Sequence, residues 1–398
     1  MEENLLPRQR ISSVRGLERS SKSPVAISVL ESRAGTECFL TSESPPDLDL
    51  AASWRALESS YHQALRDAGL DLDTEVFVRL HVSDALNQIA QLRDRIGLRG
   101  AGGLVSIVGQ SPAQRNKIAL EAYHVKGRHP CRRRLYPGGQ LVLDHGSYQM
   151  IWGSFHTRAT GSAASQTTDL LQQLEGVAAS HGGSFCDNLL RTWFFVRDID
   201  TNYQGLVEAR RELFERWGMT SATHYVASTG IAGEMQRYDE LVALDALLER
   251  GLDPAQIRFM TAESHLCPTH QYGVTFERGT RITYGDRSHY FISGTASIDK
   301  EGKILHEGDL DGQVERTLEN IEALLSRQGA HLSDLKQVLV YLRDASDGAR
   351  VRILLASLLP LSVPYIVMEG RVCRPAWLVE IEGIAGTAAA DTRFADYF

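Results

Sequence analysis

A pattern of one helix and one strand recurs three times along the chain and restricts the folds that the chain can adopt. Each copy has an amphipathic helix that ends at a glycine, and a strand that ends near an aspartate. Gly183 lies 114 residues after Gly69, and Asp198 likewise lies 114 residues after Asp84. Both landmarks recur together 146 residues further on. Two landmarks in step predict duplication at the scale of a domain; the alternative is a coincidence of spacing between unrelated domains.

The three helices share an apolar stripe at helical spacing, which marks the face that packs on a sheet. The stripes are Trp54, Leu57, Tyr61 and Leu65, then Leu170, Leu174 and Val177, then Val314, Leu318, Ile321 and Leu325. The strands that follow them are predicted at 75–82, 189–196 and 335–342. The first copy also has predicted strands at 25–30, 37–40, 103–108 and 117–125 and a second helix at 85–96. This order gives a β-β-α-β-α-β unit of the α+β class, with helices on one face of a mixed sheet.

Three such units leave three sheet faces that need cover, and packing around a common axis would let them cover one another. The sequence therefore predicts an intramolecular pseudo-trimer. The expected divisions are a mobile arm at 1–22, units at 23–126, 146–250 and 272–387, connectors at 127–145 and 251–271, and a tail at 388–398. The connectors are placed where proline, glycine and arginine gather. A chain of 398 residues with 43% hydrophobic content can bury several cores.

Composition argues against several classes of function. The formal net charge of -8 argues against nucleic acid as a partner. No apolar run is long enough to span a membrane, and the polar opening segment lacks the apolar core of a signal peptide, so we expect a cytoplasmic protein without a membrane partner. The five cysteines are odd in number and scattered, which indicates thiols rather than a disulfide framework.

The strand predicted at 378–384 carries the candidate catalytic acid. Glu380 and Glu382 alternate with apolar residues, so both carboxyl groups lie on one face, roughly 6.6 Å apart along the strand. Burial among apolar neighbours would raise the pKa of such a carboxyl and suit it to proton donation near neutral pH. The alternative is that the strand is half exposed and both glutamates face water. The aligned positions in the other copies are Ala119 and Ala243, so one working cleft and two structural ones are expected.

Three segments resemble the Rid/YjgF family. They are FISGTASIDKEGKILHEGDLDGQ (291–313), DLKQVLVYLRD (334–344) and WLVEIEGIAG (377–386). Members of that family form trimers of small domains with ligand clefts between neighbours, so the resemblance implies that three linked copies make a trimer within one chain. Deaminases of the family carry a carboxylate-binding arginine on the first strand of the terminal hairpin. This chain has Tyr365 at that place by counting back from Glu380, which argues against imine hydrolysis.

The chain is more similar to the chorismatase family, whose members are pseudo-trimers of Rid-like units. The similarity is carried by LLRTWFFVRDIDTN (189–202), ASTGIAG (227–233), FERG (276–279), FISGTA (291–296) and VCRPAWLVEIEG (372–383). It extends over 148–386 and is faint before Tyr148, where this chain holds a fuller first unit. The resemblance implies that Glu380 is the proton donor. It also implies that Gly294 and Cys373 place the chain in the 3-hydroxybenzoate-forming branch, because the hydrolysing branch has alanine at both positions.

The resemblance implies conversion of chorismate, a small dianion, to 3-hydroxybenzoate and pyruvate, with 4-hydroxybenzoate as a possible isomer. A positioned carboxylic acid would protonate the vinyl carbon of the enolpyruvyl ether. No cofactor or metal is expected, and the chain is expected to act as a monomer, with a higher oligomer left open. Two alternatives are a Rid-type enamine or imine deaminase and a non-catalytic pseudo-trimer that binds a small acid.

Arg278 and Arg191 are the candidates for binding the two carboxylates, with Tyr272 as a hydroxyl donor. Arg278 stands in a run of alternating charge, so the alternative is a solvated strand arginine. Arg191 neighbours a tryptophan on a central strand, where an unpaired cation is costly. It must therefore have an anionic partner, either a structural aspartate or the ligand.

Gly294 and Cys373 also have structural interpretations. A glycine within a strand allows a ligand to approach closely, or it marks a plain β-bulge. Cys373 lies between Arg371 and Arg374, a setting that could favour the thiolate, whereas a lone cysteine is often an apolar filler. The spacing in SHLCPTH (264–270) could suit zinc, but a fourth ligand is not evident, so no metal site is predicted.

Overall fold

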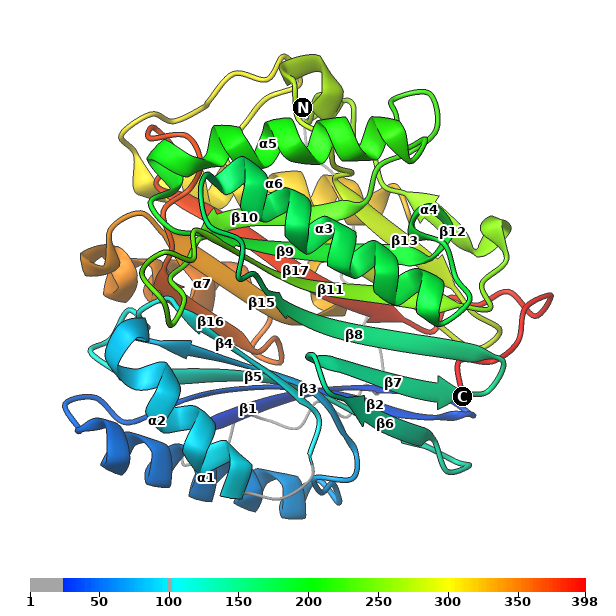
Figure 1. Ribbon diagram of the computed structural model, residues 1–398, viewed down its shortest axis with the longest axis horizontal. Helices are drawn as coiled ribbons and strands as arrows, with labels where there is room; N and C mark the ends of the chain where they lie inside the picture. The colour runs from blue at the N-terminus through cyan, green and yellow to red at the C-terminus, as the bar shows by residue number, and fades with distance from the viewer. Residues whose placement is uncertain (1–23, 99–101) are drawn as a thin grey trace, which may run out of the picture.

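The computed structural model describes residues 24–98 and 102–398. Within these residues the strands form three sheets, and helices cover their outer faces (Figure 1). The arm expected at 1–22 lies outside the described residues, as do residues 99–101. The mixed α+β architecture with three sheets confirms the predicted fold class.

The first sheet has the strand order β1-β2-β5-β3-β4, in which β3 and β4 are parallel and the other neighbours antiparallel. Its elements are β1 (Val25–Glu31), β2 (Gly35–Glu43), α1 (Leu50–Asp67), β3 (Glu75–Val82), α2 (Ala85–Leu98), β4 (Leu104–Gly109) and β5 (Ile118–Gly127). The apolar stripe predicted on α1 is buried. Asp49 begins this helix by accepting a hydrogen bond from the amide of Ala52, and Gly69, with a φ of 65°, follows its end.

The second sheet has the order β10-β9-β11-β8-β7-β6. Its elements are β6 (Arg132–Tyr136), β7 (Gln140–His145), β8 (Tyr148–His156), α3 (Ala163–Ser180), α4 (Phe185–Asn188), β9 (Leu189–Val196), α5 (Ile199–Arg216), β10 (Ala227–Ala232) and β11 (Val242–Arg250). The left-handed glycine after α3 is Gly182, with a φ of 71°, rather than the predicted Gly183. Adjacent glycines offer the chain two places for this turn, and the helix takes the first.

The third sheet has the order β12-β13-β14-β17-β15-β16. Its elements are η1 (Pro254–Gln256), β12 (Ile257–Phe259), η2 (Thr269–Tyr272), β13 (Gly279–Thr283), β14 (Ser288–Thr295), α6 (Leu310–Ser326), η3 (Leu332–Asp334), β15 (Leu335–Leu342), η4 (Ala345–Asp347), α7 (Gly348–Leu358), β16 (Tyr365–Glu369) and β17 (Val379–Thr387). The predicted central strands at 75–82, 189–196 and 335–342 coincide with β3, β9 and β15.

The stretches expected to be connectors contribute strands instead. Residues 127–145 contain β6 and β7, which pair in series with β8, and 251–271 contains β12, which pairs with β13. Apolar residues 141–143 are buried in β7. Their burial outweighs the turn-forming composition of the neighbouring sequence. The segment expected to be a tail also packs inward, because Tyr397 is buried and its amide donates a hydrogen bond to Asp286 at 2.7 Å.

Strand register relates the three units to one another. The second-last residues of the central strands β3, β9 and β15 face Ala119, Ala243 and Glu380, respectively, on the neighbouring antiparallel strands. This register confirms the alignment of these three positions that was made from sequence. The inner faces of the three sheets meet in one apolar core, in which Trp152 stacks on both Phe77 and Trp193.

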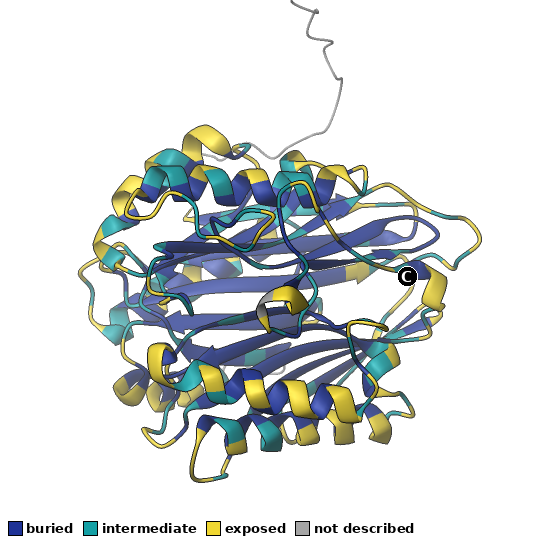
Figure 2. Cartoon of the chain, turned by 90° about the horizontal axis from the view of Figure 1, so that it is seen from above, coloured by how far each residue is buried: buried dark blue, intermediate teal, exposed yellow. Residues whose placement is uncertain are grey.

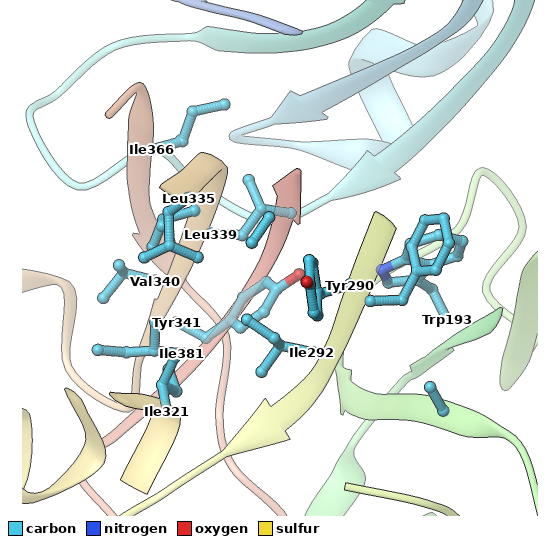
Figure 3. Close-up of a cluster of buried hydrophobic side chains, with 14 of the residues drawn as sticks. Trp193, Tyr290, Ile292, Ile321, Leu335, Leu339, Val340, Tyr341, Ile366 and Ile381 are labelled. Carbon is cyan, nitrogen blue, oxygen red and sulfur yellow. The ribbon is translucent and has the colours of Figure 1, made fainter. Parts of the chain in front are cut away.

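The arrangement leaves buried strands between layers of helices whose exposed residues point outward (Figure 2). Side chains of β9, β14, β15 and β17 meet in the core close-up, where Trp193, Tyr290 and Tyr341 are labelled (Figure 3). Within the described residues, no helix is both long and apolar enough to cross a membrane.

Candidate active site

A cavity of about 410 Å³ lies where the second and third sheets meet. One wall comes from α5 and β10, and the other from β14, β17 and the segments that precede β13 and β17. It is lined by Tyr203, Gln204, Val207, Arg210, Arg211, Ser228, Gly230, Gly273, Val274, Phe276, Arg278, Gly294, Ala296, Ile298, Cys373, Arg374, Trp377 and Glu380. Four of the six predicted site residues are therefore brought together: Glu380, Cys373, Arg278 and Gly294.

Glu380 is a buried carboxyl group on the wall of this cavity. Its side chain is on β17, opposite Tyr341 of β15, and the residue is 6% exposed. Burial and, after it, the negative charge of Glu382 raise the pKa of Glu380 to about 8, although the charges of Arg191 and Arg278 lower it. The carboxyl is therefore largely protonated at neutral pH. The alternative that both glutamates face water is wrong, since Glu382 is 3% exposed.

Gly294 makes room for the acid. It lies on β14 where the register with β17 shifts between Ile292 and Thr295, so it does belong to a β-bulge. A Cβ atom built on Gly294 would collide with Oε1 of Glu380 and would lie 2.9 Å from its Cδ. The β-bulge interpretation is thus confirmed, and the group that approaches this glycine closely in the structure is the side chain of Glu380.

Arg191 is held by a structural acid and does not line the cavity. Its Nη2 atom donates hydrogen bonds to Glu382 and to the hydroxyl of Thr229. Glu382 also accepts hydrogen bonds from Trp193 Nε1 at 3.1 Å and from the Tyr341 hydroxyl at 2.7 Å. The partner of Arg191 that the sequence left open is therefore a glutamate two residues after the candidate acid.

Arg278 lies at the cavity wall and is buried, so the alternative of a solvated strand arginine is wrong. Its Nε and Nη2 atoms donate to the carbonyl of Cys267 at 3.3 and 3.0 Å. Its charge lowers the pKa of Glu380 and so reaches the acid. Tyr272 ends η2 beside Gly273, which lines the cavity, but its side chain lies outside the described part of the chain.

Cys373 is a neutral thiol beside the acid. Burial and the neighbouring negative charge of Glu380 raise the pKa of this thiol to about 12, although a hydrogen bond with Tyr203 and the charge of Arg374 lower it. Of the two interpretations of Cys373, the one in which flanking arginines favour the thiolate is therefore wrong. Arg371 is exposed, and Arg374 stacks 4.8 Å from the ring of Trp377, so neither offsets the loss of solvation.

Sequence reasoning missed the helix that forms the opposite wall. Arg210 of α5 is buried and lines the cavity, and it donates hydrogen bonds to Thr275 Oγ1 at 3.1 Å and Ser228 Oγ at 3.3 Å. One signal could have found it. Arg210 stands at helical spacing from buried Leu206 and Leu213, so an arginine occurs within the apolar stripe.

The position compared with the carboxylate-binding arginine of the deaminases, Tyr365, lies on a strand that does not face Glu380. Tyr365 belongs to β16 and lies beneath Arg352, away from the cavity that holds Glu380. The wall opposite Glu380 comes from β10. Ser228 is the residue of β10 that is equivalent to Tyr365, because Ser228 pairs with the fourth residue of β9 and Tyr365 pairs with the fourth residue of β15. An arginine still reaches this wall, from α5 rather than from the strand.

The described residues contain no group of three or more His, Cys, Asp or Glu side chains that could hold a metal ion. In the segment with zinc-like spacing, Cys267 is buried against Arg278, and its sulfur lies 3.7 Å from Nη2 of that arginine.

The fold and the cavity define a protein of three Rid-like units in which the buried acid Glu380 lies on the wall of a cavity between two units. Residues 283–387 match the model of the endoribonuclease L-PSP family. A RutC family protein of Pyrococcus abyssi is 34% identical over 96 residues, which cover 24% of this chain and 76% of that protein. Through its third unit the chain belongs to the RutC family, and over a wider span it is a homologue of chorismatases.

Two comparisons support the similarity to chorismatases over the wider span. A 3-hydroxybenzoate synthase of Streptomyces hygroscopicus is 28% identical over 220 residues, which cover 50% of this chain and 63% of that protein, less than two thirds of its length. A crystal structure of a chorismatase superposes with a TM-score of 0.64 at 21% identity and covers 89% of this chain and 99% of that one. The second match is evidence for the fold.

Proposed function

We propose that the protein is a cofactor-free chorismatase that converts chorismate to 3-hydroxybenzoate and pyruvate. The observation that carries this proposal is Glu380, a carboxyl group with a pKa of about 8 on the wall of a cavity that also contains arginines. Few biological reactions need both an acid that is still protonated near neutral pH and cationic anchors around it. Protonation of an enol ether in a small dianion is one of them. The chorismatase and 3-hydroxybenzoate synthase homologues support this choice of substrate.

The two carboxylates of chorismate have anchors on opposite walls of the cavity. Arg278 lies on the wall of the third unit with Glu380, and Arg210 lies on the wall of the second unit. Both guanidinium groups are buried and held by hydrogen bonds, so little freedom remains to be lost when a ligand binds. Arg211 and Arg374 also line the cavity and add positive charge. We assign one substrate carboxylate to each wall, which places the ether between them.

Glu380 would donate its proton to the methylene carbon of the enolpyruvyl group and leave an oxocarbenium-like centre. The neighbouring ring hydroxyl then displaces the ether oxygen, and pyruvate leaves with the donated proton in its methyl group. The hydroxyl proton returns to Glu380. Opening of the ring oxide and loss of a ring proton give the phenol. The two products together have the composition of chorismate, so the reaction needs no water, oxidant or reductant.

Cys373 and Gly294 would set the outcome without taking the proton themselves. A thiol with a pKa of about 12 is a poor base at neutral pH, so Cys373 acts as a neutral group that borders the ring and keeps water from the cation. Gly294 lets the Glu380 carboxyl retract into the wall, which leaves the space in front of it for the substrate.

The test is to incubate the purified protein with chorismate, to separate aromatic products by chromatography and to quantify pyruvate. We expect 3-hydroxybenzoate and pyruvate in equal amounts, and a loss of about 10²- to 10⁴-fold in kcat for Glu380→Gln. Glu212→Gln is the matched control, because this residue lies on the exposed face of α5. No consumption of chorismate by the folded wild-type protein would overturn the proposal. Binding of chorismate without turnover would instead indicate a non-catalytic small-acid-binding protein.

Membership of the RutC family favours a second candidate, the hydrolysis of enamines or imines with release of ammonia. The strand position across the cavity from Glu380 is Ser228, where the deaminase pattern has arginine. We therefore rank it second. Ammonia release from an unstable amino-acid imine, together with no turnover of chorismate, would reverse this ranking.

A further inference from the structure

In each of the three units, an acid is buried at the same position of the strand that pairs antiparallel with the central strand. These acids are Glu121 on β5, Asp245 on β11 and Glu382 on β17, and each faces the equivalent residue of β3, β9 or β15. Arg79 pairs with both Glu121 and Asp245, the latter at 2.8 Å, and Arg191 pairs with Glu382. The buried acid and its arginine are thus part of the common architecture.

The third unit adds a second acid to this common one. Two residues before the buried acid, the first two units have Ala119 and Ala243, whereas the third has Glu380. Residues two apart on a strand share a face. Glu380 therefore lies beside a carboxylate that the fold supplies for another reason.

Glu382 forms an ion pair with Arg191 and is held by further hydrogen bonds. It accepts hydrogen bonds from Arg191, from the Thr229 hydroxyl, from Trp193 and from Tyr341. Four donors, one of them a cation, fix the position of this carboxyl group. Since the residue is 3% exposed, solvent screens its charge poorly.

The same network fixes Glu380 relative to Glu382. The Thr229 hydroxyl, which donates to Glu382, also accepts a hydrogen bond at 2.9 Å from the amide of Gly294. The Glu380 carboxyl rests against Gly294, and a methyl group of Thr229 lies 3.2 Å from the place where a Cβ of that glycine would be. The contacts of Thr229 therefore link the position of the Glu380 carboxyl to the position of the Glu382 carboxyl.

We propose that Glu382 is a positioning residue that keeps Glu380 in its protonated, proton-donating form. The inference rests on the proposed function for its role in catalysis. The titratable and charged groups around Glu380 are Glu382 on β17, Tyr341 on β15, Arg191 on β9, Tyr203, Arg210 and Arg211 on α5, Arg278 before β13, and Cys373 and Arg374 before β17. Glu382 is the group in this set whose charge opposes ionisation of Glu380 most strongly, in addition to burial itself.

The size of the effect follows from Coulomb's law. The strand rise puts the backbones of Glu380 and Glu382 roughly 6.6 Å apart. Two charges at about that separation, with an effective dielectric constant of about 20, shift a pKa by about two pH units. Glu382→Gln also leaves the positive charge of Arg191 without its partner, which changes the pKa of Glu380 in the same direction. We therefore expect Glu382→Gln to lower the pKa of Glu380 by about two pH units.

The experiment measures the ionisation of Glu380 directly in the ligand-free protein. Infrared difference spectra or carboxyl ¹³C signals of wild type against Glu380→Gln identify this group, and the titration is repeated in Glu382→Gln and Glu382→Asp. Glu382→Asp keeps the charge, so it should retain a raised pKa. Asp245→Asn is the matched control, because it breaks the equivalent buried pair, in which Asp245 of the second unit binds Arg79 of the first, and the second unit has alanine rather than an acid at position 243. It should lower stability and leave the Glu380 titration unchanged.

The proposal is overturned if folded Glu382→Gln titrates Glu380 as wild type does, or if Asp245→Asn shifts that titration equally. Should Glu382→Gln fail to fold, the double variant Arg191→Met/Glu382→Gln removes both charges together. It should still lower the pKa, by less, because Glu382 acts on Glu380 more strongly than Arg191 does; an unchanged titration overturns the proposal. Turnover is not needed for this measurement. Failure of chorismate turnover would overturn the proposed function and leave the titration to decide this inference.

Discussion

Replacing Gly294 by alanine tests whether the acid must retract into the cavity wall. The added Cβ would collide with Oε1 of Glu380 and would lie 2.9 Å from its Cδ and 3.2 Å from Cγ2 of Thr229. Thr229 is held by Arg191 and Glu382 and cannot give way easily. The Glu380 side chain is the movable partner, so its carboxyl is expected to be displaced toward the substrate space.

The expected magnitude comes from this displacement. Moving a catalytic group by about 1 Å lowers the rate by about 10²-fold, and an off-rotamer side chain adds about 1 kcal/mol of strain. A carboxyl pushed toward the cavity is also better solvated, so its pKa should fall below the wild-type value of about 8. We therefore expect a kcat about 10²-fold lower, with the fall in activity at high pH displaced to lower pH.

The assay is steady-state turnover of chorismate by Gly294→Ala across pH 5 to 9, with thermal unfolding as a check on folding. Gly176→Ala is the matched control, because this glycine lies on the exposed face of α3 and a Cβ there meets nothing within 4 Å. A folded Gly294→Ala enzyme with the rate and pH profile of wild type would refute the argument that this glycine exists to admit the Glu380 carboxyl.

Three further predictions concern protonation and product choice. Because Glu380 acts in its protonated form, kcat of the wild type should fall as pH rises through about 8, and this limb should be absent from the residual activity of Glu380→Gln. The raised pKa also means that the stability contributed by the proton on Glu380 is present below pH 4.5 and is lost as pH rises toward 8, so urea unfolding should show wild type losing stability relative to Glu380→Gln across that window. Cys373→Ala and Tyr203→Phe should change the ratio of 3-hydroxybenzoate to other chorismate products while chorismate is still consumed, as a product chromatogram would show. An unchanged ratio in both variants would remove this pair from the account of product choice.

The sequence predicted the elements well because each followed a local rule. The central strands and the apolar stripes of the first-unit and third-unit helices depend on periodicity within one segment, and the structure has them where periodicity placed them. Periodicity also offered a buried carboxyl at Glu380 as one of two interpretations, and the structure decides for it. Its neighbours along β17 are apolar, and a strand inside a sheet buries such a face.

The opposite wall could not be predicted because it comes from another unit. Arg210 and Glu380 are distant in sequence and meet only when the second sheet packs against the third. The same limit applies to the thiolate, one of the two interpretations of Cys373. Arg371 is its neighbour in sequence, but burial and the charge of Glu380, its neighbour in space, raise the pKa of the thiol and leave it neutral.

The close contact of Gly294 with Glu380 explains why the third unit can hold an acid at this strand position, whereas the equivalent positions of the first and second units cannot. Opposite the common buried acids Asp245 and Glu121, the second and first sheets have Ser154 and Thr41, both of which carry a Cβ. A glutamate introduced at Ala243 would meet that Cβ and also the pair of His156 and Glu240, which are 2.8 Å apart. The junction of the third unit with the first is also filled by side chains, because Arg352 pairs with Glu43 and lies over the ring of Tyr365.

Because of the contacts around Ala243, placing an acid at this position of the second unit would require Ala243→Glu together with Ser154→Gly and removal of the His156 side chain. Ala243→Glu alone should destabilise the protein, because its carboxyl would be buried without the space that Gly294 gives to Glu380.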